Sequence, residues 1–316
     1  MTEPGMDEMA QRRPRSGAGG SWLAMFPGQG SQRVGMGRSL AQRHPAAAEV
    51  FDRASAAIDA DLRELCWDSP IEVLTATQNA QPALTTVSLA AYAAFAADRP
   101  APGSAGFAGH SIGAIAAASA AGCLDVEDAV RLARARGELM AAAPGEGSML
   151  AVALGRGVAP EDVPGAGAQL AARYGLDLAA INGPRQVVLS GPGEAVREAA
   201  RLIGPRSKEL RVSHAFHSRL MAPGQPRWDQ LLDGAAFGDP VGAYFAGSTG
   251  RGVRGGDQVR EDLRRGLCEP VLWAAVMEAA GDFDELIAFG TGAAIAALAR
   301  PYLRQRRLTL VESSVP

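Results

Sequence analysis

The sequence predicts an α/β protein in which a small unit of strands and helices interrupts a larger domain. Two observations carry this prediction. Outside residues 147–213, short apolar runs that end in glycine alternate with longer helical patterns, which is typical of an α/β domain. Within residues 147–213 the order of expected elements is β-α-β-β-α-β. A chain of 316 residues suits one large domain or two smaller ones.

The first half of the chain opens on the apolar run 22–26, which Pro27 and Gly28 end and which indicates a buried strand. The polar loop 28–32 follows. A second short strand begins near residue 106 and leads into a sharp turn at 109–113. Asp125 has the position of a helix N-cap. Helical patterns cover residues 36–60, 80–97, 114–121 and 125–140.

The second half of the chain contains the inserted unit. We expect its strands at 148–154, 177–181, 186–190 and 208–212, and its helices at 160–174 and 193–203. This order is the split β-α-β arrangement of the ferredoxin-like fold. After it we expect a strand at 285–289 and helices at 255–267, 270–280 and 292–304. The predicted organisation is a solvated tail at 1–20, a large subdomain formed by 21–146 and 214–316, and a small subdomain at 147–213.

Composition excludes several classes of function. The net charge of −3 argues against nucleic acid or an anionic membrane as a partner. Three widely spaced cysteines with no CxxC pattern argue against a disulfide framework or a zinc site. No apolar run reaches the roughly 18 residues of a membrane span, and the N-terminus lacks the apolar segment of a signal peptide. We therefore expect a cytoplasmic protein.

The strongest chemical signal is the G-x-S-x-G sequence Gly109-His110-Ser111-Ile112-Gly113. Its glycines allow a serine to sit on a strained turn between a strand and a helix, where flanking side chains would clash. The turn exposes the hydroxyl of Ser111 and places the N–H of Ile112 where it can donate to a developing oxyanion. We therefore predict that Ser111 is a nucleophile.

A nucleophilic serine needs a base, and the chain has four histidines. His110 adjoins the serine, and its side chain should point away from it. His44 precedes Pro45 in an otherwise surface-like helical stretch, which favours a structural role. His214 and His217 remain. No carboxylate stands out as a third member of a triad, but a backbone carbonyl can orient an imidazole.

An ordered series of four motifs resembles a known family. They are Phe-Pro-Gly-Gln-Gly-Ser-Gln at 26–32, the G-x-S-x-G at 109–113, Arg-Ala-Arg-Gly-Glu-Leu-Met at 134–140 and His-Ala-Phe-His-Ser at 214–218. Together they resemble the malonyl-CoA:acyl-carrier-protein transacylases and the acyltransferase domains of polyketide synthases. The resemblance runs from about residue 22 to about 305. It implies an α/β-hydrolase-like large subdomain with an inserted ferredoxin-like small subdomain.

The resemblance also implies a ping-pong mechanism with Ser111 as nucleophile and His217 as general base, which makes His214 a structural or pocket-lining residue. The backbone N–H groups of Gln29 and Ile112 would form the oxyanion hole, and a main-chain carbonyl near Gly266 would orient the histidine. The acyl group would pass from CoA to the phosphopantetheine thiol of an acyl carrier protein. No metal or redox cofactor is implied.

Two residues of the series imply the acyl group. Arg136 matches the family arginine that pairs with the free carboxylate of malonyl groups, a geometry that a bidentate guanidinium suits. With 30 arginines in the chain, only this local match distinguishes it from a surface arginine. Phe216 has the pattern associated with malonyl rather than methylmalonyl units, because its ring would fill the space beside the α-carbon. Asn-Gly-Pro at 182–184 resembles the polyketide branch of the family.

Some positions depart from the family pattern, among them Ala114 where a glutamate is usual. These departures leave alternatives open: a transferase that moves an aminoacyl or peptidyl group between two carrier proteins, or an editing hydrolase. A scaffold without catalysis is disfavoured because the nucleophile, base and oxyanion positions are all retained. Carrier proteins tend to be acidic, so the arginine-rich segments 251–265 and 300–307 are candidate docking sites.

Overall fold

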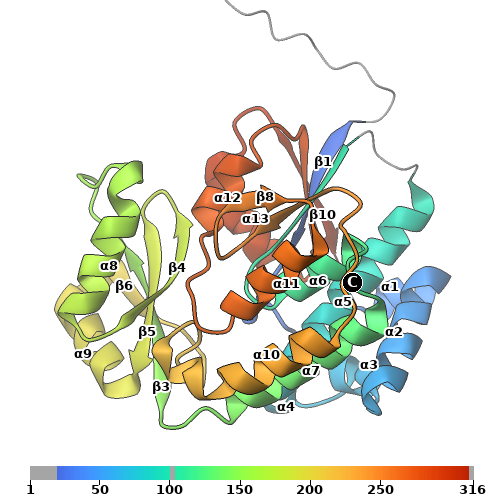
Figure 1. Ribbon diagram of the computed structural model, residues 1–316, viewed down its shortest axis with the longest axis horizontal. Helices are drawn as coiled ribbons and strands as arrows, with labels where there is room; N and C mark the ends of the chain where they lie inside the picture. The colour runs from blue at the N-terminus through green and yellow to red at the C-terminus, as the bar shows by residue number, and fades with distance from the viewer. Residues whose placement is uncertain (1–19, 100–103, 313–316) are drawn as a thin grey trace, which may run out of the picture.

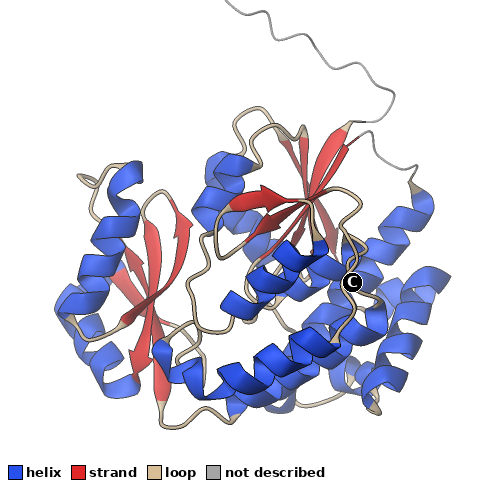
Figure 2. Ribbon diagram, viewed as in Figure 1, coloured by secondary structure: helices blue, strands red, loops and turns tan. Residues whose placement is uncertain are grey.

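The computed structural model describes residues 20–99 and 104–312. Two β-sheets lie in separate parts of the molecule, each with its own helices (Figure 1). Figure 2 shows the larger, twisted sheet among helices and the smaller sheet covered by two helices. This arrangement confirms the predicted fold class. Of the tail predicted at 1–20, all but Gly20 lies outside the described residues.

The larger sheet has six strands in the order β10-β9-β1-β2-β7-β8. All neighbours are parallel except β7 and β8. The central strands are buried on both faces, which explains their continuous apolar sequences. The strands are β1 (Ser21–Phe26), β2 (Ser104–Gly109), β7 (Ala243–Ala246), β8 (Arg251–Val253), β9 (Glu285–Gly290) and β10 (Arg307–Glu312).

The register of the two central strands places the functional loops together. Phe26, the last residue of β1, lies opposite Gly109, the last residue of β2. The backbone N–H of His110 donates to the carbonyl of Phe26 at 3.0 Å. Since parallel strands end at the same edge of a sheet, the loop after β1 and the turn after β2 leave it side by side.

The longest helix around this sheet is α5 (Thr77–Asp98), which packs against α7 (Val126–Ala141) and α2 (Pro45–Ile58). Its small residues are buried on most sides, as in an interior helix. A Cβ on Gly137 of α7 would lie 2.7 Å from the carbonyl oxygen of Thr77, so glycine permits this close helix contact. The other helices of this part are α1 (Arg38–Arg43), α3 (Leu62–Trp67), α4 (Ile71–Thr75), α6 (Gly113–Ala120), α10 (Gln225–Gly234), α11 (Gly256–Arg265), α12 (Trp273–Ala279) and α13 (Ala293–Ala299).

The smaller sheet is antiparallel, in the order β4-β5-β3-β6. Together with two helices these strands give the β-α-β-β-α-β order that the sequence predicts. A separate cluster of apolar side chains forms its core. The boundaries at 147 and 213 stay a prediction. The elements are β3 (Gly147–Ala153), α8 (Val163–Arg173), β4 (Asp177–Gly183), β5 (Gln186–Pro192), α9 (Gly193–Ile203) and β6 (Ser207–Glu209).

Several expected elements differ from those observed. The helix predicted over 36–60 is two helices, because His44 before Pro45 is extended and ends the first one. The last strand of the small sheet is Ser207–Glu209 and not 208–212. Six further elements are not predicted from the sequence, and most of them are too short for periodicity to separate from loops: α3, α4, α10, β7, β8 and β10. None of the described helices is long and apolar enough to span a membrane.

Candidate active site

Ser111 sits on the turn between β2 and α6 with a backbone φ of +53°. This left-handed conformation is strained for any residue other than glycine. The turn leaves no room beside it. A Cβ on Gly109 would lie 2.1 Å from the carbonyl carbon of Gly113, and a Cβ on Gly113 would lie 2.3 Å from the carbonyl oxygen of Phe26. The two glycines of the motif are therefore a steric requirement of the turn.

The hydroxyl of Ser111 faces the imidazole of His217. Ser111 Oγ lies 2.7 Å from His217 Nε2, although the two residues are 106 positions apart. His217 Nδ1 lies 3.0 Å from the carbonyl oxygen of Glu269. When Nδ1–H donates to this carbonyl, Nε2 presents its lone pair to the serine hydroxyl, which is the tautomer that a general base needs.

The orienting carbonyl is not where the sequence places it. We expected it near Gly266, but the carbonyl oxygen of Gly266 accepts a hydrogen bond from Arg136 Nη2 at 2.9 Å. The carbonyl of Glu269, three residues further on, takes that position beside His217. The turn after α11 therefore has two functions: one carbonyl contacts the histidine and another contacts the arginine.

The environment of His217 keeps its ring neutral. Burial, and then the positive charge of Arg136, lower the pKa of His217 to about 3. Burial also lowers the pKa of His110, whose Nε2 lies 2.8 Å from Asn182 Oδ1. The side chain of His110 thus contacts the small subdomain and not Ser111, as expected.

Arg136 is buried at the site, with 4% of its surface exposed. Its Nη1 donates to Gln81 Oε1 at 2.9 Å and its Nη2 donates to the carbonyl of Gly266. Nη2 also lies 3.5 Å from Ser111 Oγ. Burial lowers the pKa of Arg136 to about 10, so the guanidinium remains charged at neutral pH. No described carboxylate forms an ion pair with it.

A small cavity lies against these groups. Its lining includes Ser111, Ile115, Arg136, His217, Trp228 and Val271. A guanidinium, a hydroxyl and an imidazole thus share this cavity, whose lining also includes Ser248, Asp262 and Glu269. Among these groups, the guanidinium of Arg136 is the one that can pair with a carboxylate placed beside the serine hydroxyl.

The two expected oxyanion donors lie on adjacent loops. A Cβ on Gly28 would lie 3.0 Å from the carbonyl oxygen of His110, so the loop that carries Gln29 packs directly against the turn. The side chain of Gln29 is held by Thr77 Oγ1, which donates to its Oε1 at 2.9 Å. Neither the N–H of Gln29 nor that of Ile112 donates to another described residue. Both are available to a ligand.

His214 and Phe216 lie outside this cavity's lining. Their rings stack at a centroid distance of 6.1 Å. His214 is half-buried and its Nδ1 lies 2.8 Å from Ser213 Oγ, whereas Phe216 is buried. Their proximity to His217 in sequence does not bring either ring into the lining of the cavity beside Ser111.

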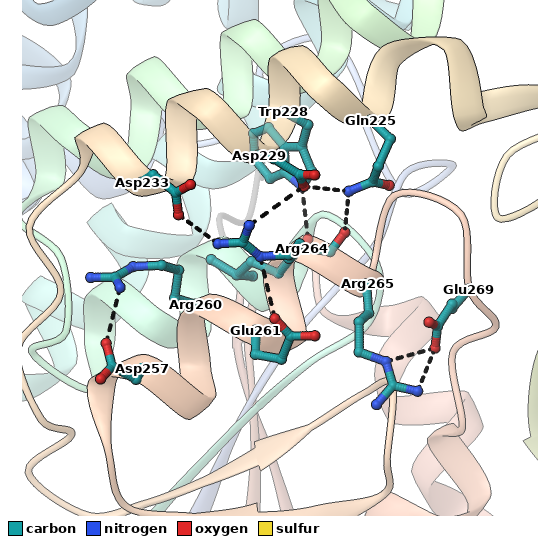
Figure 3. Close-up of polar contacts among 11 residues, drawn as sticks. Gln225, Trp228, Asp229, Asp233, Asp257, Arg260, Glu261, Arg264, Arg265 and Glu269 are labelled. Atoms are coloured by element: carbon teal, nitrogen blue, oxygen red, sulfur yellow. Dashed lines mark hydrogen bonds and ion pairs between the residues drawn. The ribbon is translucent and has the colours of Figure 1, made fainter.

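Polar contacts between α10 and α11 support the turn after α11 (Figure 3). Arg264 pairs with Asp233 at 2.6 Å and with Glu261 at 3.3 Å. The side chain of Arg265 forms an ion pair with Glu269 at 2.7 Å. In Figure 3 this pair spans the turn whose carbonyl groups contact His217 and Arg136.

Three residues of this site were missed by sequence reasoning: Thr77, Gln81 and Glu269. Glu269 acts through its backbone, so its side-chain type gives no signal. Thr77 and Gln81 are four residues apart, which places them on one face of a helix. The same helix also contains Gln78, Asn79, Thr85, Thr86 and Ser88, so this spacing alone does not distinguish the pair in the sequence.

A second, larger cavity of about 470 Å³ lies between the small subdomain and α13. Its lining includes Asn182 and three exposed arginines, Arg156, Arg185 and Arg206. None of these arginines forms an ion pair with another described residue. In the part of the chain that the structure describes, no group of three or more His, Cys, Asp or Glu could hold a metal ion.

Comparison with known proteins adds independent information. Residues 24–272 match the acyl transferase domain family. The chain is 38% identical over 313 residues to the polyketide synthase GfsB of Streptomyces halstedii, which covers 93% of this chain and 6% of that protein. It is 34% identical over 267 residues to a malonyl CoA-acyl carrier protein transacylase of Bacillus subtilis. This match covers 80% of this chain and 64% of that protein. The chain thus spans less than two thirds of these relatives.

Solved structures agree in fold. One is a malonyl-transacylase in complex with a type II polyketide synthase acyl-carrier protein. It superimposes with a TM-score of 0.81 at 30% identity, over 92% of this chain and 95% of the other.

Proposed function

The chain belongs to the acyl transferase domain family, and on this basis we propose that it is a malonyl-CoA:acyl-carrier-protein acyltransferase that acts in polyketide biosynthesis. The malonyl group passes from CoA to the phosphopantetheine thiol of an acyl carrier protein through an ester on Ser111. The names of the relatives support malonyl transfer over the movement of an aminoacyl or peptidyl group. The proposal needs no metal or redox cofactor and places the reaction in the cytoplasm.

The observation that carries the proposal is the buried charge of Arg136. Burying a guanidinium without a carboxylate partner is costly, so a binding site that retains one is suited to an anionic ligand. Its Nη2 lies 3.5 Å from Ser111 Oγ. A malonyl group has a carboxylate two bonds from the thioester carbonyl carbon. It can therefore reach Arg136 while its thioester lies at the serine.

The first half-reaction begins when His217 Nε2 takes the proton of Ser111 as Oγ attacks the thioester carbon. The N–H groups of Gln29 and Ile112 stabilise the resulting oxyanion. The carbon–sulfur bond then breaks, the ester on Ser111 forms, and the CoA sulfur leaves with the proton from His217.

The second half-reaction reverses these steps with a different thiol. His217 takes the proton of the phosphopantetheine thiol, and the sulfur attacks the ester carbon. The carbon–oxygen bond to Ser111 breaks, and the serine oxygen recovers its proton from His217. Water in place of the thiol would give hydrolysis, so the editing hydrolase uses the same groups and differs only in its acceptor.

The larger cavity suits the phosphates of both donor and acceptor. Arg156, Arg185 and Arg206 line it without ion-pair partners among the described residues, so their charges can meet phosphate oxygens. The arginines of α11 fit this role less well, because Arg260, Arg264 and Arg265 already pair with carboxylates on α10 and α11 or on the turn (Figure 3). The segment 300–307 borders the cavity near Pro301.

Phe216 is proposed to favour malonyl over methylmalonyl by excluding the extra methyl group. A difference of one methyl group gives roughly tenfold discrimination or more. Since the ring lies outside the small cavity's lining, this role requires that the acyl group extend beyond that cavity toward residues 214–216.

The test is to incubate the protein with malonyl-CoA, methylmalonyl-CoA or acetyl-CoA and to measure its intact mass. We expect a malonyl adduct, less methylmalonyl adduct and little acetyl adduct. The Ser111→Ala variant should carry none. A second incubation with a holo acyl carrier protein should move the adduct to the carrier. Release of free malonate without a carrier, at the rate of transfer, would instead identify a hydrolase.

A further inference from the structure

We propose that Gln81 is a specificity-determining residue that holds the guanidinium of Arg136 at the site with a neutral partner. Because the partner carries no charge, the positive charge of Arg136 stays available to the carboxylate of the acyl group. This inference rests on the proposed function of the site.

The carboxamide of Gln81 has a fixed orientation. The side chain is 1% exposed on α5. Its Oε1 accepts from Arg136 Nη1 at 2.9 Å. Its Nε2 donates to Thr77 Oγ1 at 3.0 Å and contacts Met140 Sδ at 3.2 Å. Reversing the amide would place its NH₂ group against the guanidinium, so only one orientation satisfies these contacts.

All three protein acceptors of Arg136 are uncharged, including Ser111 Oγ at 3.5 Å. Gln81 contributes an amide oxygen and Gly266 contributes a backbone carbonyl oxygen. Each satisfies an N–H of the buried guanidinium and fixes its plane, but neither cancels its charge. A glutamate at position 81 has nearly the same shape, but it would form a buried ion pair with Arg136. The acyl carboxylate would then have to compete with it.

The same carboxamide connects Arg136 to the loop that carries Gln29. Thr77 Oγ1 accepts from Gln81 Nε2 and donates its proton to Gln29 Oε1 at 2.9 Å. Thr77 is 1% exposed, so water does not compete for these hydrogen bonds. Gln81 therefore acts on acyl selectivity through Arg136, whereas Thr77 acts on the oxyanion loop, whose backbone N–H stabilises every acyl group alike.

The experiment measures kcat/KM for acylation of Ser111 by malonyl-CoA and by acetyl-CoA in the full chain. The Gln81→Glu variant should lower the malonyl-to-acetyl ratio by about tenfold or more, as expected for the loss of a hydrogen-bonded charge pair. The Thr77→Val variant removes a contact of Gln81 as well as one of Gln29. It should therefore slow both donors and lower the ratio by less than Gln81→Glu does. The matched control is Gln169→Glu, which adds the same charge at an exposed position of α8.

The outcomes separate this inference from the proposed function. A wild-type protein that malonyl-CoA does not acylate overturns both. If the wild type is malonylated but a folded Gln81→Glu variant keeps the same malonyl-to-acetyl ratio, only the role of Gln81 is overturned. If Gln81→Glu does not fold, Gln81→Met decides, since it removes the acceptor without adding charge. It should raise KM for malonyl-CoA while KM for acetyl-CoA stays within about twofold; an unchanged KM for malonyl-CoA would contradict the proposal.

Discussion

The two sides of the reacting pair are built in different ways. Ser111 is held by the backbone of one short stretch, in which Gly109 and Gly113 leave no space for a side chain. His217 also has a left-handed backbone, with a φ of +56°, but its ring is oriented by a contact from a distant part of the chain, the carbonyl of Glu269. A change of packing at the serine turn should therefore cause a large loss of both stability and acylation. Removal of single contacts around His217 should cause smaller, separate losses.

The largest effect is expected from Gly113→Ala. The added Cβ would lie 2.3 Å from the carbonyl oxygen of Phe26, so β1 or the turn must shift. We expect a loss of about 3 kcal/mol or more in the free energy of unfolding, together with loss of acylation. Urea unfolding measures the change in stability, and intact mass measures acylation by malonyl-CoA. The control Gly165→Ala meets no atom within 4 Å and should not destabilise. Equal stability of the two variants would refute the steric account.

Replacing the base leaves the turn intact. His217→Gln should fold, because the new side chain is smaller and uncharged, but should reduce the acylation rate by about 10³-fold or more. The rate is measured by quenched-flow mass spectrometry with malonyl-CoA. A loss of less than tenfold would mean that another group takes the serine proton.

Stability should depend on pH through His217. Its pKa is about 3 in the folded protein against 6.5 for an unperturbed histidine. Between these values the unfolded chain binds a proton that the folded protein excludes, so the free energy of unfolding decreases as the pH falls below about 6.5. From pH 7 to pH 5 this group alone costs roughly 2 kcal/mol. In urea titrations, the free energy of unfolding of His217→Gln should therefore decrease by roughly 2 kcal/mol less than that of the wild type between pH 7 and pH 5. Identical pH profiles would contradict the low pKa.

The smallest effect is expected at the exposed ion pair between Arg265 and Glu269, which lies beside the carbonyl that orients His217. Glu269→Gln removes the ion pair with Arg265 but keeps the carbonyl that contacts His217. Since both side chains are more than a third exposed, the pair contributes about 1 kcal/mol or less, and acylation should fall by less than about fivefold. Glu261→Gln, which removes a partner of Arg264, is the matched control and should leave the rate unchanged. A loss of 100-fold in Glu269→Gln would give its carboxylate a direct role.

The same contrast explains which parts the sequence predicts. The serine turn and the order of the small sheet depend on neighbouring residues, so glycine spacing and periodicity indicate both. Which residue supplies the carbonyl beside His217 depends on the path of the chain between the end of α11 and the site. This is a tertiary property, and the expected position was three residues too early. Gln81 is in an alanine-rich helix, and only its burial against Arg136 distinguishes it from an exposed glutamine.

In the proposed mechanism, the buried charge of Arg136 selects the acyl group. The most direct test is the ratio of kcat/KM for malonyl-CoA and acetyl-CoA in the wild type and in Arg136→Met, which keeps most of the volume and removes the charge. We expect a wild-type ratio well above one that falls by about 100-fold in the variant, mainly through loss of malonyl transfer. An unchanged ratio in a folded variant would contradict it.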